Sequence, residues 1–191
     1  VARNKTIINS TTADLEKLDI LIPLAKKHAS GLIGITISDK GIPQNKDQRL
    51  ELAAKILNQV SEKGFSIAEL YLDPIVMPIN VAQNQIRDIL EIILEFKMIS
   101  KPGPKTIIGL SNISQGACPV RGRTPEASDG CLRQPDSNGA RPRSLINRTF
   151  LAMAVASGLD SAILDPKDKD LMDTLITAEL ILNKNIYCDS Y

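Results

Sequence analysis

Short hydrophobic segments alternate with longer amphipathic segments along this chain. Five mostly apolar runs predict strands, at residues 5–9, 31–37, 68–73, 107–110 and 161–164. Between and after them, apolar residues recur at helical spacing, which predicts helices over about residues 14–28, 47–63, 86–100, 145–157 and 169–182. The order is therefore strand then helix, five times, which indicates an α/β fold with a parallel sheet.

Five strand–helix units are too few to close a barrel. A complete eight-unit barrel needs about 250 residues, and this chain has 191. We therefore predict one partial TIM-type (β/α) barrel domain over residues 1–191, made of the C-terminal five β/α units, with the first three units absent. An open doubly wound sheet is the alternative, but no Gly-x-Gly-x-x-Gly loop follows the first strand.

Turn and cap residues mark the ends of these elements. Ser10, Thr11 and Thr12 are suited to cap the first helix, and Pro23 predicts that this helix kinks or restarts. Gly158 is suited to end the fourth helix.

Residues 116–142 do not follow this rhythm. The segment is rich in Gly, Pro, Arg and Ser, so it cannot bury enough apolar surface, and we predict a disordered insertion. A tolerated surface insertion is favoured over a polyanion-binding arm. The arm would use Arg121, Arg123, Arg133 and Arg141.

Composition restricts the classes of function. The chain is 43% hydrophobic and 24% charged with a net charge of +1, which gives no general attraction to nucleic acid or anionic membranes. No apolar run is long enough to span a membrane and no signal peptide is evident, so we predict a cytoplasmic protein. Three cysteines and one histidine have neither disulfide-framework nor zinc-site spacing, and we predict no bound metal.

The candidate chemistry lies at the strand ends. In a barrel the C-terminal ends of the strands line one bowl. Here they carry Asn9, Ser38, Asp39, Asp73, Asn112 and Asp165. Asp39 and Asp165 are favoured as turn residues. Amides and carboxylates without a histidine or cysteine pair are unsuited to nucleophilic catalysis and suited to a neutral heteroaromatic ring with many donors and acceptors.

Six ordered blocks resemble the pterin-binding methyltransferases. They are Ile-Asn-Ser-Thr (8–11), Leu-Tyr-Leu-Asp-Pro (70–74), Asn-Val-Ala-Gln (80–83), Gly-Leu-Ser-Asn-Ile-Ser-Gln (109–115), Leu-Ile-Asn-Arg-Thr-Phe-Leu-Ala-Met-Ala (145–154) and Tyr-Cys-Asp-Ser (187–190). Within this dihydropteroate synthase-like family, the blocks are most similar to the enzymes that act on methyltetrahydrofolate and a corrinoid iron–sulfur protein in the acetyl-CoA pathway. The resemblance implies a homodimer that transfers the N5 methyl group of 5-methyltetrahydrofolate to Co(I) of a corrinoid held by that partner protein.

The resemblance also implies roles for particular residues. Asn9 and Asp73 match positions that hydrogen-bond the pterin ring, and Asn112 matches the asparagine beside N5. Gln115 and Arg143 match positions that line the same loop, although the insertion separates Asn112 from Arg143 and makes Arg141 an alternative to it. The family's N-terminal strands, with another pterin-binding aspartate, have no counterpart here.

Under this resemblance, leaving-group chemistry makes Asn112 suited to the catalytic role. A tertiary amine N5 leaves only if it is protonated or strongly hydrogen-bonded, and Co(I) is a potent nucleophile, so positioning and a hydrogen bond that strengthens in the transition state are sufficient. The alternatives are a dihydropteroate synthase-type enzyme, whose basic phosphate-binding residues have no clear counterpart, and a non-catalytic pterin-binding remnant. The folate domain of cobalamin-dependent methionine synthase is less favoured, because the ligands of its zinc module are absent from the sequence.

Overall fold

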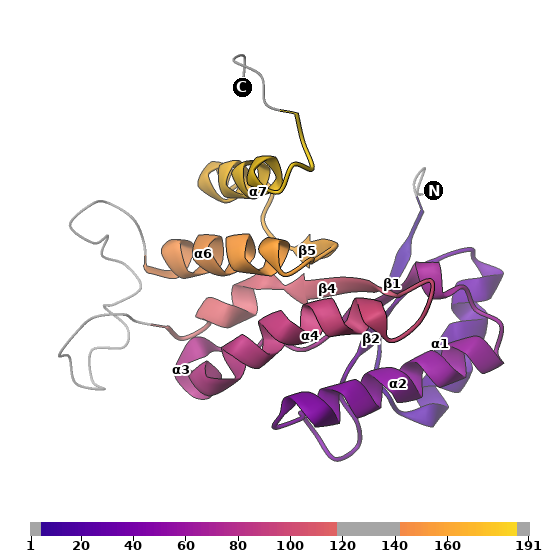
Figure 1. The fold of residues 1–191 in the computed structure, drawn as a ribbon. Coiled ribbons are helices and arrows are strands. Elements are labelled where there is room, and N and C mark those ends of the chain that lie inside the picture. Colours follow the sequence, from indigo (N-terminus) through magenta and orange to yellow (C-terminus); the bar gives the residue numbers. More distant parts are fainter. Residues whose placement is uncertain (1–4, 118–141, 187–191) are drawn as a thin grey trace. The chain divides into compact units, whose positions relative to one another are not determined.

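The computed structural model describes residues 5–117 and 142–186. Helices and strands alternate as the hydrophobic pattern predicts (Figure 1). The strands are β1 (Ile7–Thr11), β2 (Gly31–Ile35), β3 (Leu70–Asp73), β4 (Lys105–Gly109) and β5 (Ser161–Ile163). The helices are α1 (Leu15–Lys27), α2 (Lys46–Glu62), α3 (Ile79–Ala82), α4 (Ile86–Met98), α6 (Pro142–Ala156) and α7 (Lys169–Ile181). Short 3₁₀ turns are η1 (Ile67–Glu69), η2 (Gln83–Gln85) and η3 (Leu110–Ser114).

The strands form one sheet in the order β1-β2-β3-β4-β5. The pairs β1–β2, β2–β3 and β3–β4 are parallel. Neighbouring strands are thus consecutive in the chain, as in a (β/α) barrel. The α/β prediction is confirmed, and the arrangement is compatible with part of a TIM-type barrel.

The chain divides into two compact units, which are described separately. The first contains residues 1–75, 87–108 and 157–162, and so carries the sheet with α1, α2 and α4. The second contains residues 76–86, 109–156 and 163–191, and so carries α3, η3, α6 and α7.

The core of the first unit lies between the sheet and its helices. Leu32, Leu70 and Leu72 from β2 and β3 are fully buried against apolar side chains of the helices. The helical contributors recur every three or four residues along each helix. They are Leu18, Ile22 and Ala25 of α1, Ala53, Ile56, Leu57 and Val60 of α2, and Ile92 and Phe96 of α4.

The details of α1 differ from the sequence expectations. Asp14 caps α1, because its carboxylate accepts a hydrogen bond from Glu16 N, whereas Thr11 lies within β1. The helix continues through Pro23. In α4 the apolar stripe that is buried passes through Ile89, Ile92, Ile93 and Phe96, whereas Leu94 is 52% exposed.

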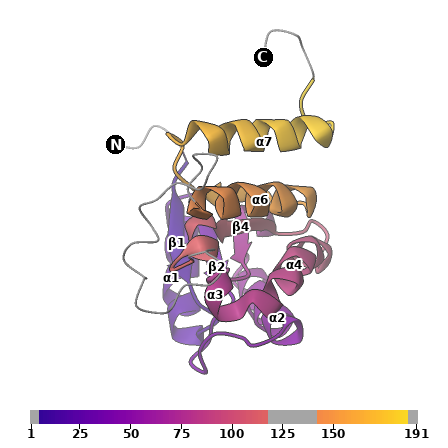
Figure 2. The ribbon, with the colours of Figure 1, turned by 90° about the vertical axis from the view of Figure 1, so that its left-hand side faces the viewer.

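In the second unit α6 packs against both η3 and α7 (Figure 2). Arg148 on α6 forms an ion pair of 3.0 Å with Asp170 on α7. Residues 118–141, which make up nearly all of the predicted disordered insertion, lie outside the described residues. Of the insertion's described ends, Ala117 donates to Ser114 O in a turn, and Pro142 begins α6.

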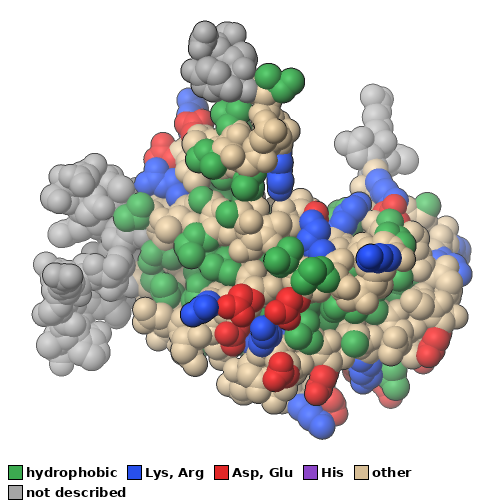
Figure 3. Space-filling model, viewed as in Figure 1, with side chains coloured by type: hydrophobic (Ala, Val, Ile, Leu, Met, Phe, Trp, Pro, Cys, Tyr) green, Lys and Arg blue, Asp and Glu red, His purple; other side chains and the backbone are tan. Residues whose placement is uncertain are grey.

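Charged side chains cover the outer surface of α2 and α4. Lys46 forms ion pairs with both Glu91 and Glu95, at 3.3 and 2.9 Å. Figure 3 shows acidic and basic side chains mixed on one face of the molecule. Among the described residues, no helix combines the length and apolar character needed to cross a membrane.

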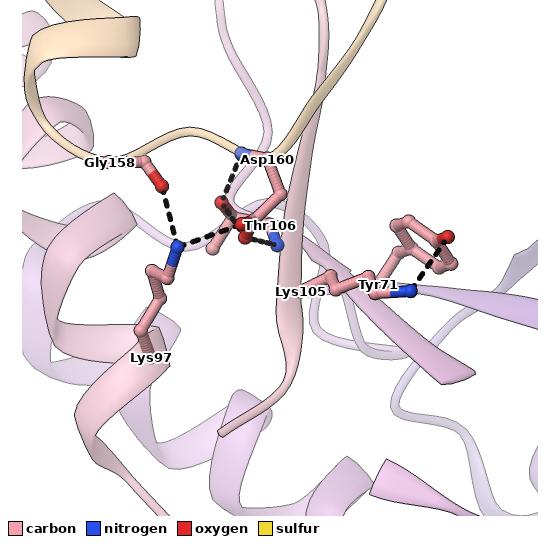
Figure 4. Close-up of polar contacts among 6 residues, drawn as sticks. All are labelled: Tyr71, Lys97, Lys105, Thr106, Gly158 and Asp160. Carbon is pink, nitrogen blue, oxygen red and sulfur yellow. Dashed lines mark hydrogen bonds and ion pairs between the residues drawn. The ribbon is translucent and has the colours of Figure 1, made fainter. Parts of the chain in front are cut away.

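A polar cluster connects α4 to the N-terminal ends of β4 and β5 (Figure 4). Asp160 accepts hydrogen bonds from Thr106 N at 2.8 Å, Thr106 Oγ1 at 3.1 Å and Lys97 Nζ at 2.8 Å. Lys97 also donates to Gly158 O at 3.0 Å, and Gly158 has a φ of +93°, as its predicted role at the helix end requires. Asp160 and Thr106 lie at the N-terminal ends of their strands, the end of a barrel that serves stability.

We predict that Asp160→Asn lowers the free energy of unfolding by about 1–3 kcal/mol, because the amide presents N–H groups to one of the three donors. Urea denaturation measures this. Asp170→Asn is the matched control, since its carboxylate is 67% exposed in an ion pair, and it should change stability by less than about 0.5 kcal/mol. Equal losses of stability in the two variants would show that the hydrogen bonds of Asp160 stabilise the fold no more than an exposed ion pair does.

Candidate functional site

Asp73 ends β3, as predicted, and is half-buried. Alternation decides its direction: Leu70 and Leu72 belong to the helix-side core, so Tyr71 and Asp73 lie on the opposite face of the sheet. Ile33 and Ile35 are their register partners on β2. A carboxylate is thus presented at the C-terminal end of a parallel strand, on the face opposite the core formed with α1, α2 and α4.

Asn9 lies on the same face but is not a strand end. Strand β1 continues to Thr11, so the prediction that it stops at Asn9 was wrong. Ile8 packs against the helix-side core, which places the exposed Asn9 side chain on the opposite face. Asn9 and Ser10 fall in a register irregularity, where Ile8 pairs with Leu32 but Thr11 pairs with Gly34. Such bulges re-aim side chains and are frequent next to active sites.

The loop after β3 holds the Asp73 carboxylate in place. Its Oδ1 accepts a hydrogen bond from Ile75 N at 2.8 Å. Ile75 has a φ of +62°, a left-handed conformation that is rare for a β-branched residue. Among the described residues, Oδ2 accepts no hydrogen bond. One oxygen is therefore fixed by the backbone and the other is available to a ligand.

Burial raises the pKa of Asp73 to about 6, although the bond from Ile75 N acts in the opposite direction. Near neutral pH the carboxylate is therefore mostly ionised but incompletely solvated. An ionised carboxylate in such a place binds paired N–H donors more strongly than one in water does.

Three predicted site residues lie in the second unit. Asn112 and Gln115 are exposed at and just beyond η3, and Arg143 is half-buried in the first turn of α6. Arg143 Nε donates to Ser114 Oγ at 3.2 Å, which joins α6 to the turn that carries Asn112. The structure thus brings Asn112 and Gln115 together with Arg143. Arg141, the alternative to Arg143, lies outside the described residues.

Glycines shape the turn around Asn112. A Cβ atom on Gly109 would lie 3.1 Å from Asn112 Nδ2, so the asparagine side chain folds back over a residue that must be small. Gly116 has a φ of +66°, and its carbonyl accepts a hydrogen bond from Asn80 Nδ2 at 3.3 Å. The Gly-Leu-Ser-Asn block is therefore a structural unit in which glycine gives the amide room.

Asn147 is a candidate that the strand-end argument missed. It lies one helical turn after Arg143 on α6, and its buried Oδ1 has no hydrogen-bond partner within residues 5–117 and 142–186. An unpaired buried acceptor costs about 1–3 kcal/mol. Its position within the block at residues 145–154 was the available signal.

Other predicted strand-end residues serve as turns. Asp165 Oδ1 accepts a hydrogen bond from Lys167 N at 2.9 Å, which confirms it as a turn residue. Ser38 and Asp39 lie in a loop closed by the Ser38–Gly41 bridge. A mostly apolar groove of about 710 Å³ between α6 and α7 includes none of the five site residues. Within the described ranges, no group of three or more His, Cys, Asp or Glu side chains is arranged to hold a metal ion.

No protein-family model matches the chain. It is 24% identical over 189 residues to the methylcorrinoid:tetrahydrofolate methyltransferase of Eubacterium limosum. The match covers 97% of this chain and 60% of that relative. This similarity supports a relation to methyltransferases of that kind.

We predict that Asp73→Asn stabilises the protein at pH 7.5. Folding raises the pKa of the Asp73 carboxyl group from 3.8 to about 6. The contribution of such a group to the stability of the folded protein is largest below its unfolded pKa, and it is lost as the pH rises through its folded pKa. The amide removes that loss and still accepts from Ile75 N, so the gain at pH 7.5 is about 1–3 kcal/mol. It should vanish near pH 4.

Urea denaturation of both proteins at pH 4 and pH 7.5 measures the difference. Asp165→Asn, at an exposed strand-end aspartate, is the control and should change stability by less than about 0.5 kcal/mol. A variant at position 73 that is less stable than the wild type at pH 7.5 would contradict the assignment of a destabilising charge.

Proposed function

We propose that this chain belongs to an enzyme that moves a methyl group between N5 of tetrahydrofolate and the cobalt of a corrinoid carried by a partner protein. The observation that carries the proposal is Asp73, a half-buried strand-end carboxylate with one oxygen fixed and one available. Its available oxygen suits an N–H donor of an aminopyrimidinone, and the negative charge strengthens that bond. The similarity to a methylcorrinoid:tetrahydrofolate methyltransferase supports the same chemistry.

Asn9 and Asp73 bind the pterin in this proposal. They share the face of the sheet opposite α1, α2 and α4, and both offer acceptors to a flat ring. Asn112 acts beside N5, and Gln115 and Arg143 line its turn. The convergence of these two groups on one ligand is a prediction, because they belong to different units.

The chemistry needs no covalent intermediate on the protein. As the methyl group leaves, the electron pair of the N5–carbon bond stays on nitrogen, which takes a proton from solvent, and the electron pair of Co(I) forms the new carbon–cobalt bond. In the reverse direction the N5 lone pair attacks the methyl carbon, Co(I) departs with the electron pair of the carbon–cobalt bond, and N5 releases its proton to solvent. A hydrogen bond from the Asn112 amide to N5 stabilises the same transition state in both directions.

The expected partner is a corrinoid iron–sulfur protein of the acetyl-CoA pathway, with the methyltransferase acting as a homodimer. The chain spans about 60% of the length of its relative, and the activity proposed is that of the whole protein.

A stopped-flow assay with free Co(I) cobalamin and 5-methyltetrahydrofolate tests the function, because the corrinoid spectrum changes on methylation. The expected result is formation of methylcobalamin. Pterin binding by calorimetry without methyl transfer would instead indicate a non-catalytic pterin-binding protein. Condensation of a pterin diphosphate with aminobenzoate would indicate a dihydropteroate synthase-type enzyme.

We predict that Asn112→Ala lowers the rate of methyl transfer at saturating folate by about 10²-fold, with a smaller effect on folate affinity, because its bond to N5 strengthens only in the transition state. Ser111→Ala alters the neighbouring exposed side chain in the same turn, and it should leave both constants nearly unchanged. An unaltered rate in the Asn112 variant would remove this residue from the mechanism.

We predict that folate affinity falls below pH 6. Protonation removes the negative charge of Asp73, whose pKa is about 6 in the free protein, and so weakens its bond to the ligand. Each further unit of pH below 6 then costs up to about tenfold in affinity. Calorimetry between pH 5 and pH 8 measures this. In Asp73→Asn affinity should be lower at pH 7.5 and flat across that range, and a slope equal to that of the wild type would assign the titration elsewhere.

A further inference from the structure

Arg49 is the largest fully buried side chain in the part of the chain that the structure describes. It lies in the first turn of α2, with 0% of its surface exposed. Burial lowers the pKa of the guanidinium, and nearby Asp88 acts in the opposite direction. Replacing a buried charge by an apolar side chain of similar size is often neutral or stabilising. The presence of arginine at this position therefore calls for a reason other than packing.

The contacts of Arg49 supply that reason. Its Nε donates to Pro74 O at 2.9 Å, in a buried hydrogen bond, and its Nη1 donates to Asn45 O at 3.2 Å. Pro74 separates the candidate carboxylate, Asp73, from Ile75, whose N–H holds Asp73 Oδ1. The guanidinium thus connects the start of α2 to the peptide in the middle of the loop that fixes the carboxylate.

The opposite side of Asp73 is fixed as well. Thr36, just beyond β2, donates to Asp73 O twice, from N at 3.1 Å and from Oγ1 at 3.0 Å. Consecutive carbonyls, of Asp73 and Pro74, therefore each have donors from a different element, and the next residue is the left-handed Ile75. A strained conformation persists only where its surroundings determine it fully.

We propose that Arg49 is a positioning residue for the ligand-binding carboxylate: it fixes the 74–75 peptide so that Ile75 N–H orients Asp73 toward a bound pterin. This inference rests on the proposed pterin binding. Arg49 acts through the backbone and makes no contact with the ligand. Thr36 Oγ1 does the same from the other side.

A double-mutant cycle tests the proposal, with 5-methyltetrahydrofolate as the probe in calorimetry on the full chain. Arg49→Met keeps most of the side-chain volume but removes the donors to Pro74 O and Asn45 O, and we expect about tenfold weaker binding. In the Asp73→Asn background the same substitution should change affinity by less than about twofold, because the group that it positions is already altered. A purely structural role would give equal losses in both backgrounds and would overturn the proposal.

Further variants keep the test decisive if Arg49→Met does not fold. Thr36→Val removes the Oγ1 donor within a similar shape, and we expect about two- to fivefold weaker binding with the same dependence on Asp73. Arg49→Lys retains one charged donor and should restore part of the affinity. Val60→Ala, buried at the far end of α2, is the control and should lower stability but leave affinity unchanged.

The outcomes separate this inference from the function on which it rests. Wild-type protein that does not bind the folate would reject the proposed function. Binding that weakens in Asp73→Asn but is unaffected by Thr36→Val and by any folded Arg49 variant would reject the positioning role alone.

Discussion

The candidate site depends on the burial of three leucines on one side of the sheet. Leu32, Leu70 and Leu72 are fully enclosed by α1, α2 and α4. Because side chains alternate along a strand, this packing fixes Tyr71 and Asp73 on the other face, and a slip of one residue would drive the carboxylate into the apolar layer. The direction of the key polar group is therefore set by a hydrophobic contact that never touches the ligand.

At the end of β3 the chain tolerates features that oppose stability. Asp73 is an acid held where its charge is poorly solvated, Ile75 adopts a left-handed backbone, and a buried arginine supports the loop between them. Each of these features lowers the stability of the folded protein. The cost would be removed by an amide in place of Asp73, a glycine in place of Ile75 or an aliphatic side chain in place of Arg49. Unfavourable features that are concentrated in a few neighbouring residues are typical of functional sites, where stability is given up to hold functional groups in a fixed geometry.

Sequence periodicity predicted the order of elements, the end of β3 at Asp73 and the role of Gly158, because each depends on local pattern or turn chemistry. It did not predict that β1 continues past Asn9, since the bulge depends on pairing with β2. Arg49 was not among the predicted site residues, because candidates were sought only at the ends of strands. Its spacing from Ala53, Ile56 and Val60 places it on the buried stripe, so the helical period, and not residue type, was the informative signal. The joint placement of Asp73 and Asn112 is not a matter of local pattern and stays a prediction.

In the proposed site a charged residue, Asp73, binds one end of the pterin and a neutral residue, Asn112, binds the end that carries N5. This division suits a reversible methyl transfer. N5 alternates between a methylated tertiary amine and a secondary amine, and a fixed charge beside it would favour one of these states. An asparagine amide can donate from nitrogen or accept at oxygen, so in the proposed reaction Asn112 serves both states without changing its protonation. A carboxylate is better used where the ring always presents the same donors, which is the part of a pterin that does not react. Asp73, held by Ile75 N–H and by the support of Arg49, fits that constant task. In this reading the two residues differ because the two ends of the ligand differ: one end keeps its hydrogen-bonding pattern throughout the reaction, and the other changes it.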